Sequence, residues 1–259
     1  KNQTGNSMPG RFYLRRFLKK AAAAGCGYAL VEVTSQGVVF SRHRFFNWNA
    51  GILTNIAPEH IEAHGSFEKY RASKLAFLRY VLSRGGSVFI NADDKESGYF
   101  LAKLKGGKIN TYSAHDDSTS RLLSRVSPLR SSLEPGVGRA LRSKFNEGNA
   151  ACAVAAARSL GIDEKVTEEA VRDFEGIPGR MEVLRRGGVT VVVDYAHTPD
   201  SLRKVYETIQ GLRIGDRGSR MICVLGAAGG GRDKWKRPVM GEIAAEYCDE
   251  IVLTNEDPY

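Results

Sequence analysis

The sequence predicts an α/β protein in which helices flank a mostly parallel central sheet. Segments with helical spacing alternate along the chain with short apolar segments, and this alternation is typical of parallel strands joined by helical crossovers. The chain has 259 residues, of which 42% are hydrophobic. A chain of this length can bury a core in one large domain or in two smaller ones.

The first part of the chain is predicted to alternate between helices and strands. Gly25 is a plausible helix C-cap, and Ser66 is a plausible N-cap. The predicted helices of this part span residues 11–25, 66–86 and 145–162, and the predicted strands span residues 28–35, 51–54 and 87–94. Residues 106–142 are polar and rich in Ser, Pro and Gly, so irregular strands and loops at a sheet edge are expected there.

A second α/β pattern follows the turn at Pro178-Gly179. An apolar strand at 189–197 leads into a helix for which Thr198 is the N-cap and Pro199 the first residue. Strand, helix and strand then continue over residues 220–226, 236–250 and 251–259. We therefore expect two domains, residues 1–178 and residues 179–259.

Composition excludes several classes of protein. No apolar run approaches the roughly 18 residues of a membrane span, and no export signal is evident, so no membrane partner is expected. The four cysteines form no C-x-x-C pair, which favours reduced thiols in a cytoplasmic protein. The net charge of +9 would suit nucleic acid or a phosphorylated small substrate. The positive residues are spread along the chain without a nucleic-acid-binding motif, so no nucleic-acid partner is expected.

Polar side chains recur where predicted strands end. Ligands of open α/β sheets bind beyond the carboxyl ends of the strands, and the residues found there are Asn55, Glu59, His60, Asp194 and His197. Glu32 lies between valines inside a predicted strand, where a carboxylate needs a metal or a cationic partner to offset desolvation. Both interpretations of Glu32 stay open, as do the roles of His60 and His64.

A glycine-rich turn follows the predicted strand 220–226. Such turns bind anions through backbone N–H groups, although this one does not have the dinucleotide spacing G-x-G-x-x-G, and a flexible surface turn is the alternative. The chain also contains no G-x-x-x-x-G-K-[ST] phosphate loop. Taken alone, that argues against an intact NTPase.

Eight motifs, in this order and spacing, resemble the Mur ligases, and among them most closely the MurE group, the UDP-N-acetylmuramoyl-tripeptide synthetases. They are "VEVTSQ", "TNIAPEHIEAHGSFEKYRASK", "INADD", "FNEGNA", "GIPGRMEV", "VVVDYAHTPDSL", "GRDKWKRPVMGEIA" and "TNEDPY". The resemblance implies a central ATP-binding domain over residues 1–178 and part of a Rossmann-like C-terminal domain over residues 179–259. It also implies that the phosphate loop and a uridine-binding domain precede residue 1, so that this chain would be a fragment that is inactive alone.

The implied reaction is ATP-dependent amide formation in peptidoglycan synthesis, in the cytoplasm. ATP would phosphorylate a carboxylate of UDP-N-acetylmuramoyl-L-Ala-D-Glu, and the amine of the third stem-peptide amino acid would displace the phosphate, with Mg²⁺ neutralising phosphate charge. The resemblance implies that Lys74 is carbamylated by CO₂ and holds Mg²⁺ together with Glu32 and His60. A carbamate offers the anionic oxygen that Mg²⁺ prefers, and a partly buried lysine loses its proton more readily.

The remaining implied roles are carried over by position. The implied ATP contacts are Asn149, Asn146, Arg180, Asp194 and His197. The implied UDP-muramoyl contacts are Ser7, Met8, Thr34, Ser35 and Arg42. The implied amino-acid contacts are Arg232, Glu256, Asp257 and Tyr259. A monomer is expected.

Several positions depart from the family pattern. Gln36 stands where the family usually has His, Glu59 where it has Asp, and Met8 where Thr is common. Members that add diaminopimelate read Asp-Asn-Pro-Arg, and their arginine pairs with the distal carboxylate, whereas Tyr259 offers no positive charge. Lysine, diaminopimelate and other amino acids therefore remain open as the substrate. The alternative functions are another ligase of the superfamily, such as a folylpolyglutamate or cyanophycin synthetase, and a non-catalytic basic binding module.

Overall fold

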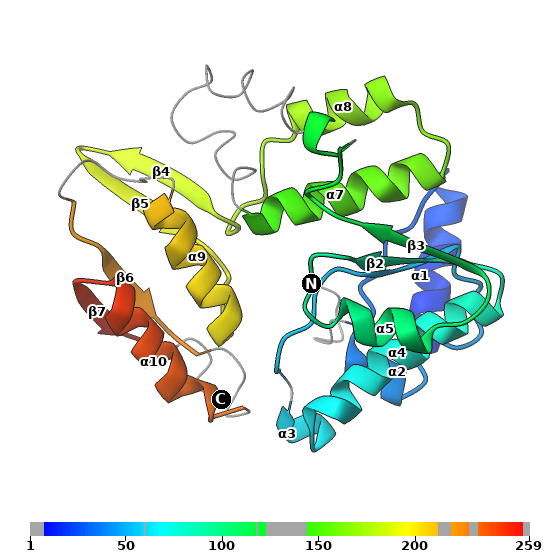
Figure 1. Ribbon diagram of the computed structural model, residues 1–259, viewed down its shortest axis with the longest axis horizontal. Coiled ribbons are helices and arrows are strands. Elements are labelled where there is room, and N and C mark those ends of the chain that lie inside the picture. The colour runs from blue at the N-terminus through cyan, green and yellow to red at the C-terminus, as the bar shows by residue number, and fades with distance from the viewer. Residues whose placement is uncertain are drawn as a thin grey trace. The chain divides into compact units, whose positions relative to one another are not determined.

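The computed structural model describes residues 8–59, 61–117, 119–122, 144–211, 219–227 and 233–255. It confirms the predicted mixture of parallel strands and helices (Figure 1). The chain divides into two compact units. The first comprises residues 1–90 and 95–110, and the second comprises residues 91–94 and 111–259. The predicted domain boundary at Pro178-Gly179 lies inside the second unit, in residues 111–259, and stays a prediction.

The first unit contains a three-stranded sheet, except for residues 91, 111 and 112 at the ends of two strands, which fall in the second unit. Strand β1 (Ala50–Leu53) pairs in parallel with β2 (Ser87–Asn91), and β3 (Lys108–Tyr112) follows in the order β1-β2-β3. Helix α4 (Phe67–Ser83) connects the two parallel strands. The strand at 108–112 falls in the stretch for which irregular strands were expected, and most of the rest of that stretch lies outside the described residues.

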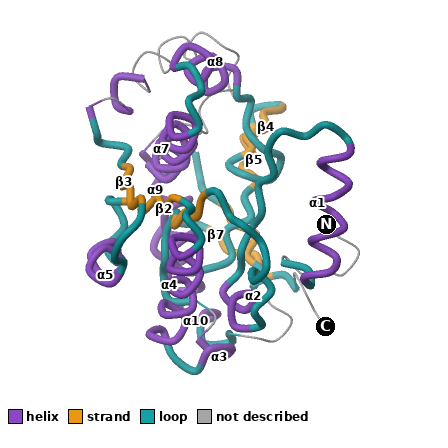
Figure 2. Tube along the Cα trace, turned by 90° about the vertical axis from the view of Figure 1, so that its right-hand side faces the viewer, coloured by secondary structure: helices purple, strands orange, loops and turns teal. Residues whose placement is uncertain are grey.

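Helix α4 packs against β1 and two short helices, α2 (Ser35–Val39) and α3 (Ile61–His64) (Figures 1 and 2). Its N-cap is Ser66, as predicted, and the hydroxyl of this residue accepts a hydrogen bond from the backbone N–H of Lys69 at 3.3 Å. The apolar face of α4 is buried in the core of the unit. That core includes Leu53, Leu78, Val81, Val88, Ile90 and Phe100.

The turn from α4 into β2 requires glycine. A Cβ atom on Gly86 would lie 2.3 Å from the backbone oxygen of Trp48, a distance at which no side chain fits. Gly85, the preceding residue, has φ of +80°, in the left-handed region that favours glycine. The glycine pair that predicts the end of this helix therefore also sets how closely β2 approaches the segment before β1.

Helix α1 (Arg11–Ala23) ends as the sequence predicts, because Gly25 adopts a φ of +80° and the N–H of Cys26 bonds to the carbonyl of Ala21 at 3.0 Å. Helix α5 (Ser97–Lys103) lies between β2 and β3 in the chain. None of the helices in the described ranges is both long and apolar enough for a membrane crossing.

The predicted strand at 28–35 is wrong. Residues 28–34 form no strand, and Ser35 begins α2. A strand needs a neighbour to take its backbone hydrogen bonds, and no described segment pairs with these residues. Leu30 consequently remains 95% exposed.

The second unit contains two pairs of strands. The β4 (Glu182–Arg186) and β5 (Val189–Val193) pair is an antiparallel hairpin, whereas β6 (Ile222–Leu225) and β7 (Glu250–Leu253) are parallel. The hairpin turn is Gly187-Gly188, with φ of 57° and 78°, and consecutive positive φ values match the twist of the flanking strands.

Helices of this unit pack on one face of β6. Helix α9 (Pro199–Gly211) packs against α10 (Lys236–Tyr247), and their core includes Leu202, Tyr206, Cys223, Leu225, Met240 and Ile243. Helix α7 (Lys144–Ser159), the predicted alanine-rich helix, buries Ala150, Ala151 and Val154 and packs against α8 (Glu164–Asp173).

Candidate functional site

Lys74 lies on α4, one turn after Tyr70. Because residues i and i+4 share a helix face, the Lys74 ammonium rests over the Tyr70 ring, with Nζ 5.1 Å from the ring centroid. Tyr70 is 5% exposed, and Lys74 is half-buried. Burial raises the pKa of Tyr70 above its ordinary value, and the nearby Glu59 carboxylate raises this pKa further. Tyr70 therefore presents Lys74 with a neutral ring face, which attracts a cation.

His64 joins this pair to the start of α2. Its ring centroid lies 5.4 Å from that of Tyr70, and its Nε2 lies 3.0 Å from the Oγ of Ser35. Ser35 is 4% exposed. The contacts thus run without a break from Lys74 through Tyr70 and His64 to Ser35. Two of these four residues, Lys74 and Ser35, are site residues predicted from the sequence, and His64 had no assigned role.

Four predicted substrate contacts gather around α2. The Thr34 hydroxyl caps the helix by accepting a hydrogen bond from the N–H of Gly37 at 3.1 Å, and Ser35 follows it. Met8 is 1% exposed and packs so closely on Gly37 that a Cβ there would lie 2.3 Å from the Met8 sulfur. Arg42 donates a hydrogen bond to the Met8 carbonyl. The fifth predicted contact, Ser7, lies outside the described residues.

The three predicted metal ligands are not all described. The Glu32 side chain is exposed rather than buried in a strand, so it needs no compensating partner, but its oxygens are of the type that Mg²⁺ prefers. His60 lies outside the described residues, and Lys74 would supply oxygen only as a carbamate. Within the part of the chain that the structure describes, no three His, Cys, Asp or Glu side chains gather as metal ligands do. The donor type of Glu32 fits magnesium, and an assembled metal site stays a prediction.

A second cluster forms in the second unit at the end of β5. The Asp194 carboxylate accepts hydrogen bonds from the backbone N–H groups of Met181 and Ala196, both at 2.8 Å. This carboxylate therefore fixes the corner at which the chain leaves the strand. Met181 is 2% exposed and adopts a φ of 49°, which is uncommon for a residue with a side chain.

Tyr195 gathers the other two predicted ATP contacts of this region. The guanidinium carbon of Arg180 lies 4.8 Å from the centre of the Tyr195 ring. The His197 ring lies 5.1 Å from the same ring, centroid to centroid, and its Nδ1 is 2.9 Å from the Tyr195 carbonyl oxygen. Arg180, Asp194 and His197 therefore belong to one local cluster.

The two asparagines of α7 that are implied ATP contacts are hydrogen-bonded to each other. The amide nitrogen of Asn149 donates a hydrogen bond to the side-chain oxygen of Asn146 at 3.1 Å. Asn149 is exposed, so its amide remains accessible. The four predicted amino-acid contacts, Arg232, Glu256, Asp257 and Tyr259, lie outside the described residues.

Sequence reasoning missed the two tyrosines that organise these clusters. Tyr70 could have been found from the spacing of "YRASK", which places it on the helix face of Lys74. Tyr195 stands between Asp194 and His197 in "DYAH", but no pattern in the sequence shows that Arg180 reaches its ring. The left-handed φ of Met181 likewise leaves no signal in the sequence.

Two ranges of the chain match known family models. Residues 1–157 match the family described as Mur ligase middle domain, and residues 179–259 match the one described as Mur ligase, glutamate ligase domain. Two relatives are named UDP-N-acetylmuramoyl-L-alanyl-D-glutamate–2,6-diaminopimelate ligase. The one from Synechococcus elongatus is 34% identical over 95% of this chain and 50% of its own length, and the one from Gloeobacter violaceus is 35% identical over 98% and 52%.

A solved structure with the same ligase name has a TM-score of 0.60 at 24% identity and covers 96% of this chain and 52% of its own. At that identity the likeness shows the fold alone. The chain thus spans about half the length of the relatives that it matches. The first family match covers more than half of the chain, and the second covers residues 179–259. The chain therefore belongs to the Mur ligase family.

Proposed function

We propose that this chain forms part of an ATP-dependent amide ligase that adds the third amino acid to UDP-N-acetylmuramoyl-L-Ala-D-Glu. The observation that carries the proposal is the unbroken run of contacts from Lys74 through Tyr70 and His64 to Ser35. A residue expected at the catalytic metal and a residue expected at the muramoyl substrate are thereby held in one network. The names of the relatives support the same reaction.

The proposed reaction has two steps. An oxygen of the substrate carboxylate attacks the γ-phosphorus of ATP, and ADP leaves with the electrons of the broken P–O bond. The amine of the incoming amino acid then attacks the acyl carbon, loses a proton, and expels inorganic phosphate. Bound Mg²⁺ supplies charge neutralisation for the phosphates. The chain's own residues orient the substrates, which lowers the entropic part of the barrier.

Lys74 has a defined task in this proposal. Its ammonium must first lose a proton, and the free amine nitrogen then forms a bond to the carbon of CO₂ and releases a second proton, which leaves an anionic carbamate. The Tyr70 ring favours the ammonium form, so carbamylation must displace Nζ from the ring face. His64 lies against the same ring, where its imidazole N–H can donate to a carbamate oxygen.

Arg180, Asp194 and His197 are proposed to contact ATP, with Asn149 and Asn146 at its base. Asp194 uses both carboxylate oxygens to hold backbone N–H groups, so its task is to position the corner rather than to transfer a proton. Arg180 is exposed and always charged, which suits a phosphate contact.

The deciding experiment measures ADP release by the full-length protein that contains this chain. ADP release is expected to require the UDP-muramoyl dipeptide and to rise further when a suitable amino acid is present. A panel that includes lysine and diaminopimelate identifies that amino acid. ADP release that is indifferent to the dipeptide would refute the proposed function.

The choice of amino acid is proposed to depend on Tyr259. The relatives are named for 2,6-diaminopimelate, but tyrosine cannot form an ion pair with its distal carboxylate. The Tyr259→Arg variant is expected to raise the kcat/KM for diaminopimelate relative to lysine by about tenfold or more, as a charge-assisted hydrogen bond would do. Tyr259→Phe is the matched control and should leave this ratio unchanged. If the unmodified protein already prefers diaminopimelate, the charge argument is wrong.

A further inference from the structure

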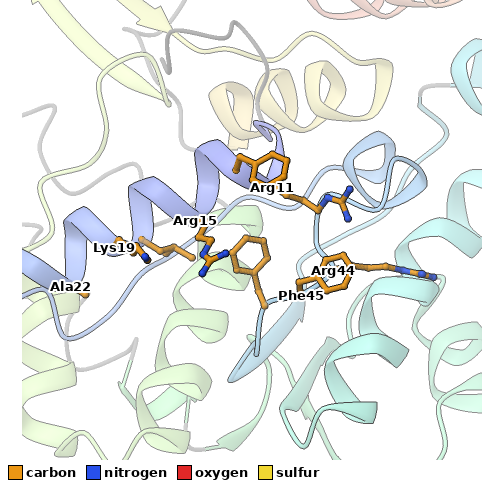
Figure 3. A pocket seen from close by; sticks show the side chains of 9 residues that line it. Arg11, Arg15, Lys19, Ala22, Arg44 and Phe45 are labelled. Carbon is orange, nitrogen blue, oxygen red and sulfur yellow. The ribbon is translucent and has the colours of Figure 1, made fainter.

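We propose that a groove between α1 and residues 44–46 binds single-stranded nucleic acid. The groove has a volume of about 720 Å³ and lies within the first unit. None of its described lining residues belongs to the Lys74 network. Its walls are the basic side chains of α1, Arg44 and the rings of Phe12, Phe45 and Phe46. Figure 3 shows Arg11, Arg15 and Lys19 extending from α1, with Phe45 on the facing segment.

The fold gathers charges that are dispersed in the sequence. None of the nine described residues that line the groove is acidic, and four of them are Arg or Lys. Arg11, Arg15 and Lys19 follow one another at four-residue intervals, so they are about 6 Å apart along the helix axis. Phosphates of an extended strand repeat at a similar interval. A row of evenly spaced cations favours a polyanion with a regular repeat over a single small anion.

The aromatic rings distinguish nucleic acid from other polyanions. Phe12 is 81% exposed and Phe45 is 77% exposed, so much of each ring is accessible to a ligand. The guanidinium carbon of Arg11 lies 5.2 Å from the centre of the Phe45 ring. Cations that follow a backbone, together with exposed rings on which bases stack, are the features by which proteins bind single strands without reading their sequence.

The backbone at Phe45 supports a binding role. Its φ is 71°, in the left-handed region that a bulky residue rarely adopts. Its N–H bonds to the Tyr80 hydroxyl at 2.9 Å, which fixes this conformation. This strained backbone does not bury the Phe45 ring, which stays exposed. A strained backbone that holds an apolar ring in solvent is expected where the ring meets a ligand.

The test measures binding of the full chain to a fluorescently labelled twelve-residue oligothymidylate by anisotropy, at 50 to 200 mM salt. Phe45→Gly, which removes the ring and suits the observed φ, is expected to weaken binding by about 5- to 150-fold, the loss of one stacked base. Arg15→Gln should weaken binding and reduce the salt slope by about 0.7, the value for one phosphate contact of a single strand.

Two matched controls separate the groove from general charge and hydrophobicity. Lys105→Gln removes an equal charge beside a second basic cavity that has no aromatic lining, and Phe17→Ala removes an exposed ring of α1 that does not line the groove. Neither should change binding by more than twofold. Equal losses in Lys105→Gln and Arg15→Gln, or inorganic polyphosphate binding that matches the oligonucleotide and ignores Phe45→Gly, would overturn the proposal. Ligase activity is a separate measurement, because no groove residue belongs to the proposed active site.

Discussion

Tyr70 connects residues of the first unit that stand far apart in the sequence. It is buried, and its ring contacts both the Lys74 ammonium and the His64 imidazole. His64 in turn reaches Ser35, 29 residues earlier. A lysine held in this way keeps few rotamers, so little further ordering is needed when a substrate binds. The network makes Lys74 the first residue to test.

Replacing Lys74 should abolish the proposed ligase activity. In the full-length protein, Lys74→Ala is expected to lower kcat at least a hundredfold, because it removes the group proposed to become a metal-binding carbamate. Added short carboxylic acids should restore part of the activity by supplying the missing anionic oxygen. Lys69→Ala, which removes an exposed lysine from the same helix, is the control. Unchanged turnover in Lys74→Ala would exclude this residue from the site.

His43 should make the first unit sensitive to acid. The residue is 5% exposed, its Nδ1 has no hydrogen-bond partner within the described part of the chain, and its ring lies edge-on to Phe77 and Tyr80. Burial, and then the charge of Arg44, lower the pKa of His43 below its ordinary value. The unfolded chain therefore binds a proton as pH falls below about 6.5, whereas the folded chain resists it. The free energy of unfolding should fall over that range.

The His43→Phe variant should remove that contribution. A buried nitrogen without a hydrogen-bond partner costs about 1–3 kcal/mol of stability. Phenylalanine keeps a ring in the same apolar site and has no such nitrogen. The variant is expected to gain stability relative to the unmodified chain as pH falls from 7.5 to 5, as measured by guanidinium unfolding at each pH. His115→Phe, at an exposed histidine, should not change the pH dependence. An identical acid response in His43→Phe would show that other groups cause it.

At the scale of elements, the sequence predicts helices better than it predicts pairing. The helix ends at Gly25 and Ser66 follow from local chemistry, a positive φ and a capping hydroxyl, and both are confirmed. The strand expected at 28–35 fails because a strand depends on a neighbour that local sequence does not reveal. The contacts of Lys74 with Tyr70 follow from helical spacing, but those of His64 with Ser35 depend on how α2 and α3 pack against α4.

The β4–β5 hairpin should depend on the φ of its second turn glycine. Gly188 has a φ of 78°, and a Cβ there would meet nothing within 4 Å, so any cost of substitution comes from the backbone alone. Gly188→Ala is expected to destabilise the second unit by about 1–2 kcal/mol. Gly241→Ala, at a helical glycine of α10 that also has open space, should instead stabilise it by up to about 1 kcal/mol. Calorimetric Tm values of the two variants should therefore move in opposite directions, and equal shifts would contradict this assignment.

At the scale of the whole molecule, the two units have separate cores. Among the described residues, one cluster of the first unit is built around Leu78, Val81 and Ile90, and one of the second around Met240, Ile243 and Leu225. Each cluster draws only on residues of its own unit. A substitution that opens a cavity in one cluster removes packing from that unit alone.

The separate cores predict two calorimetric transitions that respond to different substitutions. Leu78 and Met240 are each 1% exposed, and truncation of either to alanine is expected to cost about 2–5 kcal/mol. Leu78→Ala should lower the Tm of one transition and leave the other in place, and Met240→Ala should do the reverse. A domain that unfolds by itself gives its own transition, so the matched pair assigns each peak to a unit. If both variants lower the Tm of one common transition by similar amounts, the two units unfold together. The Lys74 network and the Asp194 corner would then be lost in the same transition.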